Sequence, residues 1–118
     1  MKRASSVAIL FVCVVWVPLL VQVRPVDAAG DASKGKPLYE KHCLVCHGLQ
    51  GKGDGPTGTL IKPPAANFTS EASKKKTEAE LLGTMENGRP GTAMGPWKGL
   101  LSPSDLRDVL AYVMALRK

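Results

Sequence analysis

The five residues Cys43-Leu44-Val45-Cys46-His47 constrain this chain more than any other stretch. Two thiols lie three positions apart, and an imidazole directly follows the second thiol. Outside this stretch, the sequence contains one further cysteine, Cys13, and one further histidine, His42. The pattern is not repeated, so no second group of sulfur and nitrogen ligands exists to complete it.

Four kinds of site use two cysteines at this spacing. A zinc site normally needs four ligands, and after the N-terminal region all candidate ligands would come from residues 42–47, a strained cage. A dithiol redox site is expected near a β-α-β unit, and the sequence shows no such pattern. A disulfide suits an exported protein but leaves His47 without a role. Covalent haem attachment uses all three side chains, because Cys-x-x-Cys-His is typical of c-type haem.

Geometry explains why haem attachment uses this spacing. Two thiols three apart on a helical turn can each add to one haem vinyl group, so Cys43 and Cys46 are predicted to carry thioether bonds. The next residue, His47, then projects its imidazole toward the iron and is predicted to be the proximal ligand. A haem would also fill the middle of a domain with few aromatic side chains. From residue 29 on these are Tyr39, Phe68, Trp97 and Tyr112.

The first 28 residues predict a secretory signal peptide. Lys2 and Arg3 precede a long apolar run, which leads to the small-x-small exit of residues 26–28. We therefore expect cleavage after Ala28, a single domain at 29–118, and a periplasmic or otherwise exported protein. The alternative is a retained membrane anchor facing the periplasm, because a span of ~20 apolar residues suffices to cross a bilayer.

The charge of the predicted domain is mildly basic and scattered. Residues 29–118 hold thirteen Lys and Arg against nine Asp and Glu. Charge clusters only at residues 74–76, three consecutive lysines without interleaved aromatic residues, so nucleic-acid binding is not expected. This cluster is interpreted as a solvated loop or, alternatively, as a docking patch for an acidic partner.

Three helices and long Gly/Pro-rich loops are predicted, which gives an all-α class. The first helix covers residues 31–47 with Asp31 as its cap, and either begins near Lys36 or is kinked at its start, because Pro37 lacks an N–H. The second begins with a capping box at 77–80 and ends at a left-handed Gly88. The third begins at residues 102–105 and buries one face. That face consists of Leu106, Val109, Leu110 and Val113.

The segments GDASKGKPLYEKHCLVCHGLQGKGDGP, GRPGTAMGPW and LSPSDLRDVLAYVMAL together resemble the small, single-haem class I cytochromes c of bacteria. The resemblance extends from about residue 31 to residue 116. It implies the small class I fold wrapped around one covalently bound haem c. It also implies that Gly35 and Tyr39 on the first helix meet Val109 and Tyr112 on the last.

A class I cytochrome needs a second axial ligand, and Met94 is the predicted one. Met94 lies in an irregular Gly/Pro-rich stretch that serves no helix face, and the family places its axial methionine in such a loop. Met85 is the weaker alternative, because its helical spacing favours core packing. His42 directly precedes the attachment turn, so it is not expected to reach the opposite face of the haem. Met114 lies in the terminal helix, where a packing role is expected.

The resemblance also implies roles for two residues of the haem pocket. In family members with a short loop after the motif, a proline carbonyl accepts a hydrogen bond from the ligand histidine, which points to Pro56 here. Trp97 is expected to line the haem or to reach a propionate.

The predicted function is electron transfer between redox partners, with no chemical change in a substrate and hence no enzymatic activity. His/Met ligation fits a carrier, because it leaves no open iron position. Two alternatives stay open: a haem subunit of a larger oxidoreductase complex, and an open-iron protein with peroxidase-like or gas-binding activity.

Overall fold

The computed structural model describes residues 29–118, so the predicted signal peptide lies outside the described residues. Five helices follow one another along the chain, and within this range no β-strand forms beyond one isolated bridge. The predicted all-α class is confirmed. The helices are α1 (Ala32–His42), α2 (Leu44–His47), α3 (Glu71–Lys74), α4 (Glu78–Asn87) and α5 (Pro103–Leu116). Two more helices occur than the sequence predicted, because α1 and α2 are separated at Cys43 and the four-residue α3 lacks a recognisable pattern.

The beginnings of the two later helices follow the sequence signals. Thr77 and Glu80 form the predicted capping box of α4. Ser102 and Asp105 form the same arrangement at α5, with Pro103 at the first helical position. Each box satisfies two backbone N–H groups that a helix start would otherwise leave without partners. These local signals therefore fix where α4 and α5 begin.

The start of α1 differs from one of the two predictions. The helix begins at Ala32 and continues through Pro37, so a start near Lys36 is wrong. The carboxylate of Asp31 accepts a hydrogen bond from the Ser33 N–H at 2.8 Å, which fixes the first turn. Pro37 lies in the second turn, where its missing N–H removes a single helical hydrogen bond, the one to the carbonyl of Ser33.

Helices α1 and α5 cross in close contact. A Cβ atom on Gly35 would lie 1.9 Å from the carbonyl oxygen of Asp108, so only a glycine allows this approach. One turn further, the Tyr39 ring lies 5.2 Å from that of Tyr112, centroid to centroid. Tyr39 is fully buried and donates a hydrogen bond to the Gly48 carbonyl at 2.7 Å. The predicted crossing is confirmed.

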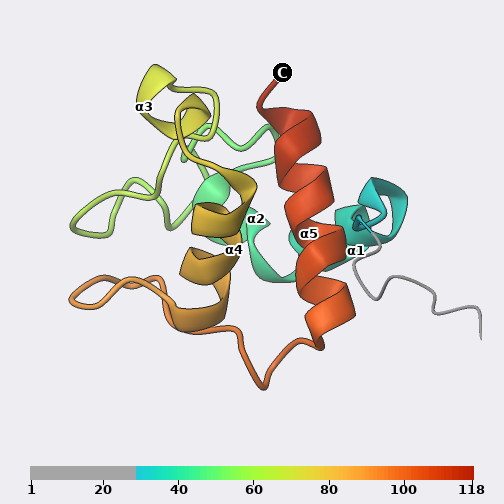
Figure 1. Cartoon of the computed structure of the whole chain (residues 1–118). Coiled ribbons are helices and arrows are strands. Elements are labelled where there is room, and N and C mark those ends of the chain that lie inside the picture. Colours follow the sequence, from blue (N-terminus) through green and yellow to red (C-terminus); the bar gives the residue numbers. More distant parts are fainter. Residues whose placement is uncertain (1–28) are drawn as a thin grey trace, which may run out of the picture.

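The buried apolar side chains come from one side of the molecule. In residues 29–118 they are Tyr39, Leu106, Val109, Leu110 and Val113. Helix α4 contributes no fully buried residue. In Figure 1 one loop from each of the irregular segments 48–70 and 88–102 extends to the side of α4 that faces away from α5. Within the described part of the chain, no helix is both long and apolar enough to cross a membrane.

Candidate functional site

A cavity of about 360 Å³ lies on the α4 side of the molecule. Its walls come from the end of α1 with α2, from segment 61–76, from α4, from segment 89–97 and from α5. Most of its surface is apolar. Its titratable lining residues include two cations, Lys76 and Arg89, but no Asp or Glu. The cavity therefore suits a large, mostly apolar group that carries some negative charge.

The turn between α1 and α2 brings three predicted site residues to this cavity. Cys43, Cys46 and His47 all line it. The N–H groups of Cys46 and His47 both donate to the carbonyl of Cys43, at 3.2 and 2.9 Å, so the three residues form one helical turn. Side chains three and four apart lie on one face of such a turn.

The two cysteines are free thiols in the structure. Burial, followed by the proximity of Cys46, raises the pKa of the Cys43 thiol to about 11. In the described part of the chain, no group of three or more His, Cys, Asp or Glu side chains is placed to hold a metal ion.

The imidazole of His47 is held by a backbone carbonyl. Its Nδ1 lies 3.1 Å from the carbonyl oxygen of Ala66, and its ring stacks on Phe68 with 4.5 Å between centroids. A carbonyl can only accept, so Nδ1 carries the proton and Nε2 keeps its lone pair. Burial lowers the pKa of His47, against a smaller opposing effect of the Ala66 hydrogen bond. The neutral tautomer with a free Nε2 is the form that binds a metal.

The prediction that the Pro56 carbonyl accepts a hydrogen bond from His47 is wrong. Pro56 is exposed and does not line the cavity. Residues 53–57 instead fold under the end of α2, where their N–H groups bond to its last carbonyls. These bonds are Gly53 to His47 at 2.8 Å, Gly55 to Cys46 at 3.2 Å, and Thr57 to Val45 at 2.9 Å. This loop therefore provides hydrogen-bond donors for the last carbonyls of α2. The carbonyl that accepts from the His47 imidazole comes from a later segment, at Ala66.

Met94 and Met85 both line the cavity, and their surroundings differ. Met85 packs from α4 against the core cluster of Tyr39, Val109 and Val113. Met94 is not among the residues packed on that cluster, and its segment is held through its backbone, since the Arg89 N–H donates to the Met94 carbonyl at 2.8 Å. The sulfur of Met114 accepts a hydrogen bond from Arg117 at 2.9 Å, and Met114 does not line the cavity.

Gly88 makes the fold of the Met94 segment possible. Its φ of 69° is the predicted positive value, but its ψ of −170° is extended, so the predicted left-handed helical cap is wrong. A Cβ on Gly88 would lie 2.6 Å from the Met94 carbonyl. The chain needs this glycine to turn sharply out of α4 and to let the Met94 backbone approach closely.

Trp97 lines the cavity, together with His42, which the sequence set aside as an axial ligand. The His42 and Trp97 rings meet edge to face, with 5.3 Å between centroids. Other lining residues that were missed lie in segment 61–76. They include Ala66, Phe68, Ser73 and Lys76. No periodic pattern or motif distinguishes them, so their positions follow from the tertiary fold.

The cytochrome c family matches residues 32–117 of the chain. Cytochrome c-554(547) of Halothiobacillus neapolitanus is 31% identical over 96 residues, which cover 75% of this chain and all of that protein. The cbb3-type cytochrome c oxidase subunit FixP of Bradyrhizobium diazoefficiens is 34% identical over 93 residues. That match covers 78% of this chain, and the chain spans only 30% of the length of FixP.

A solved structure agrees with this assignment. Cytochrome c6 of the diatom Phaeodactylum tricornutum superposes with a TM-score of 0.54 at 27% identity, over 75% of this chain and 95% of that structure. Fold and site thus define a small helical electron-transfer protein with covalently bound haem c. The chain belongs to the cytochrome c family, as the resemblance in its sequence indicated.

The residues around the cavity fit a haem c on their own chemistry. Two thiols and an imidazole with a free Nε2 lie on one helical turn at an apolar cavity, and thioether side chains reach the same cavity from other segments. A haem is largely apolar and carries two carboxylates, which matches a lining with two cations and no carboxylate.

Proposed function

We propose that this protein is a one-electron carrier whose haem c lies in the cavity described above. Cys43 and Cys46 would hold the haem through thioether bonds, and His47 and Met94 would bind its iron. The observation that carries the proposal is that the predicted haem-binding side chains meet at one place in the fold. Two segments that lie about fifty residues apart in the sequence bring the two thiols, the imidazole and a thioether to one apolar cavity.

The chain's own residues position and shield the site. The Ala66 carbonyl accepts a hydrogen bond from the Nδ1–H of His47 and thereby fixes the ring orientation and its tautomer. Phe68 and Trp97 supply apolar aromatic surface to two parts of the lining. A haem c supplies reversible one-electron chemistry at its iron. With His47 and Met94 both bound to its iron, a haem in this cavity would offer no site to a substrate, so the protein would act as a carrier and not as an enzyme.

The test of this proposal is a pair of methionine variants. Met94→Ala should abolish the weak absorption band near the red end of the visible spectrum that a methionine–ferric iron bond produces. It should also lower the reduction potential markedly and allow cyanide or carbon monoxide to bind. Spectra and an optical redox titration of the purified holoprotein measure all three effects.

Met85→Ala is the matched control, because Met85 lines the same cavity from α4. It should keep the band and lower the free energy of unfolding by about 2 kcal/mol, the lower end for such a truncation because the side chain is only partly buried. Loss of the band in Met85→Ala alone would transfer the ligand role to Met85. A wild type that binds carbon monoxide readily would favour the open-iron alternative.

A haem subunit of a larger oxidoreductase complex is the second candidate function. The match to FixP, which is a subunit of a cbb3-type oxidase, supports it. A subunit should co-purify with membrane proteins through a high-salt wash, whereas a mobile carrier should be recovered alone. The partners in either case are redox proteins that donate and accept single electrons.

We further propose that the protein is exported and that its leader is removed after Ala28. The apolar run and the small residues at positions 26 and 28 support this proposal. N-terminal sequencing of the native protein should find Ala29 first. A native protein that begins at Met1 and pellets with membranes would instead establish the retained anchor.

A further inference from the structure

Arg117, at the end of α5, is a buried cation surrounded by neutral acceptors. Only 7% of its surface is exposed. Its Nη2 donates to the carbonyls of Ser73 and Lys76, the latter at 3.0 Å, and its Nη1 donates to the sulfur of Met114 at 2.9 Å. Its Nε is buried without a hydrogen-bond partner. None of these contacts removes the positive charge.

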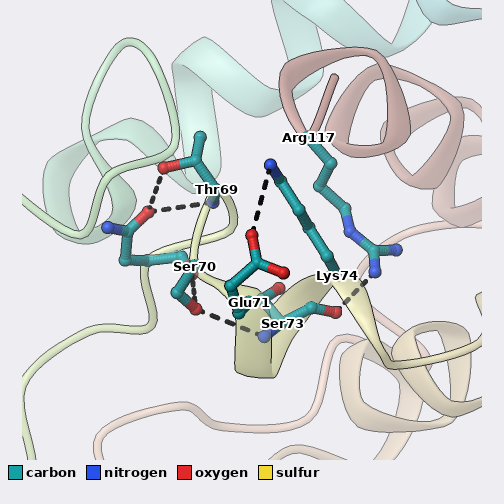
Figure 2. A network of polar contacts seen from close by, with 7 residues as sticks. Thr69, Ser70, Glu71, Ser73, Lys74 and Arg117 are labelled. Carbon is teal, nitrogen blue, oxygen red and sulfur yellow. Dashed lines mark hydrogen bonds and ion pairs between the residues drawn. The ribbon is translucent and has the colours of Figure 1, made fainter.

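No carboxylate pairs with Arg117 in the described range 29–118, where the two ion pairs are Lys36–Glu40 and Glu71–Lys74. Glu71 is near in sequence to Ser73, but its carboxylate lies 3.8 Å from Lys74 Nζ. Figure 2 shows this pair beside Arg117, whose dashed contact runs to Ser73. Because a guanidinium keeps its proton in proteins, Arg117 is a permanent positive charge.

This charge lies directly behind one wall of the cavity. Ser73 and Lys76, whose carbonyls hold the guanidinium, both line the cavity, and so does Val113, one turn before Arg117 on α5. A buried charge acts through a medium of low polarity and is screened by salt far less than a surface charge. Arg117 therefore contributes a fixed positive potential in the cavity.

We propose that Arg117 raises the reduction potential of the haem by this buried charge. One electron from a donor protein lowers the net charge of the haem by one and moves no proton. A nearby positive charge stabilises the reduced form relative to the oxidised form. The inference rests on the proposed function, because it requires the haem to occupy this cavity. Arg117 is thus a tuning residue that touches neither the haem ligands nor a partner.

The hydrogen bonds of Arg117 also hold the cavity wall at residues 73–76 in place. The experiment must therefore distinguish the effect of its charge from the effect of this structural support. Arg117→Gln removes the charge, and Arg117→Lys keeps the charge but loses the forked hydrogen bonds. Lys118→Gln is the matched control, because it removes one charge from the neighbouring, exposed residue. Optical redox titrations of the four holoproteins at low and high salt, with unfolding curves for each, give the comparison.

We expect Arg117→Gln to shift the midpoint potential downward, by a similar amount at low and high salt. Arg117→Lys should keep the potential near the wild-type value although its stability falls. Lys118→Gln should produce a smaller shift that disappears at high salt.

Two results would overturn the inference: an unchanged potential in Arg117→Gln, or an equal fall in Arg117→Lys, which would assign the effect to wall support. If Arg117→Gln yields no holoprotein, the lysine variant decides alone, since a fall in its potential contradicts the charge effect. Failure of the proposed function looks different, because haem would then extract completely from the wild-type chain into acid acetone.

Discussion

The crossing of α1 with α5 and the side of the molecule around α4 are built on different principles. At the crossing, Gly35 lets two backbones touch, and Tyr39 and the inner face of α5 are buried by other side chains. Helix α4 itself has no fully buried residue, and two long irregular segments line a cavity beside it. Direct contact between helices holds the first region together, whereas the second encloses a cavity that the proposed haem would fill.

This difference explains why a domain of this size uses so many glycines and prolines. A flat cofactor must be covered by chain that follows its surface, and regular helices cannot do this on every side. Long loops in a compact domain usually have such a function. The α1–α5 crossing therefore serves as the scaffold, and the proposed haem would account for the long loops on the α4 side.

The largest expected effect is on the α4 side. Replacement of both Cys43 and Cys46 by alanine should let acid acetone extract the haem completely, as intact mass would show. Without the haem, hydrogen exchange should find that α4 and residues 88–102 lose more protection than the α1–α5 crossing. Val45→Ala, at an exposed position of the same turn, should keep its haem. Equal loss of protection on both sides would contradict the comparison.

A smaller effect is expected at the crossing. Gly35→Ala puts a Cβ atom 1.9 Å from the Asp108 carbonyl, so α1 and α5 must separate. Overpacking of this kind typically lowers the free energy of unfolding by ~1–3 kcal/mol. Denaturant unfolding of the holoprotein measures it. A stability equal to wild type would show that the crossing is less tightly packed than the structure indicates.

The same substitution in α4 should have the opposite sign. A Cβ on Gly83 would meet no atom within 4 Å. Alanine is favoured over glycine inside a helix by ~0.5–1 kcal/mol, so Gly83→Ala should stabilise the protein by up to that amount. If unfolding curves show destabilisation, the space beside Gly83 is filled in the holoprotein.

The smallest effect concerns docking at the cavity. If Lys76 attracts acidic partners, Lys76→Gln should slow oxidation of the reduced protein by ferricyanide, an anionic stand-in for such a partner. The difference should vanish above 0.1 M salt, where the Debye length is ~10 Å or less. Lys34→Gln, on α1 away from the cavity lining, is the control for stopped-flow measurements. A rate independent of salt would leave residues 74–76 as a solvated segment.

Much of the site could be predicted because its signals are local. The spacing of the two cysteines and the histidine fixes one helical turn, and this turn lies at the cavity. The irregular surroundings of Met94 distinguished it from Met85, and the two differ in packing in the structure. Pro56 could not be assigned correctly, because which carbonyl meets the imidazole depends on how residues 48–70 fold over α2.

The sequence by itself determined the beginnings of α4 and α5, the buried face of α5 and the attachment motif, since each depends on residues within one or two turns. The tertiary structure alone decided three other features. It placed the Ala66 carbonyl at His47, allowed α1 to run through Pro37 against α5, and buried the charge of Arg117 behind the cavity wall. These features depend on segments far apart in the chain, and their energies arise only when packing excludes water and brings backbone carbonyls to side chains that no local pattern pairs with them.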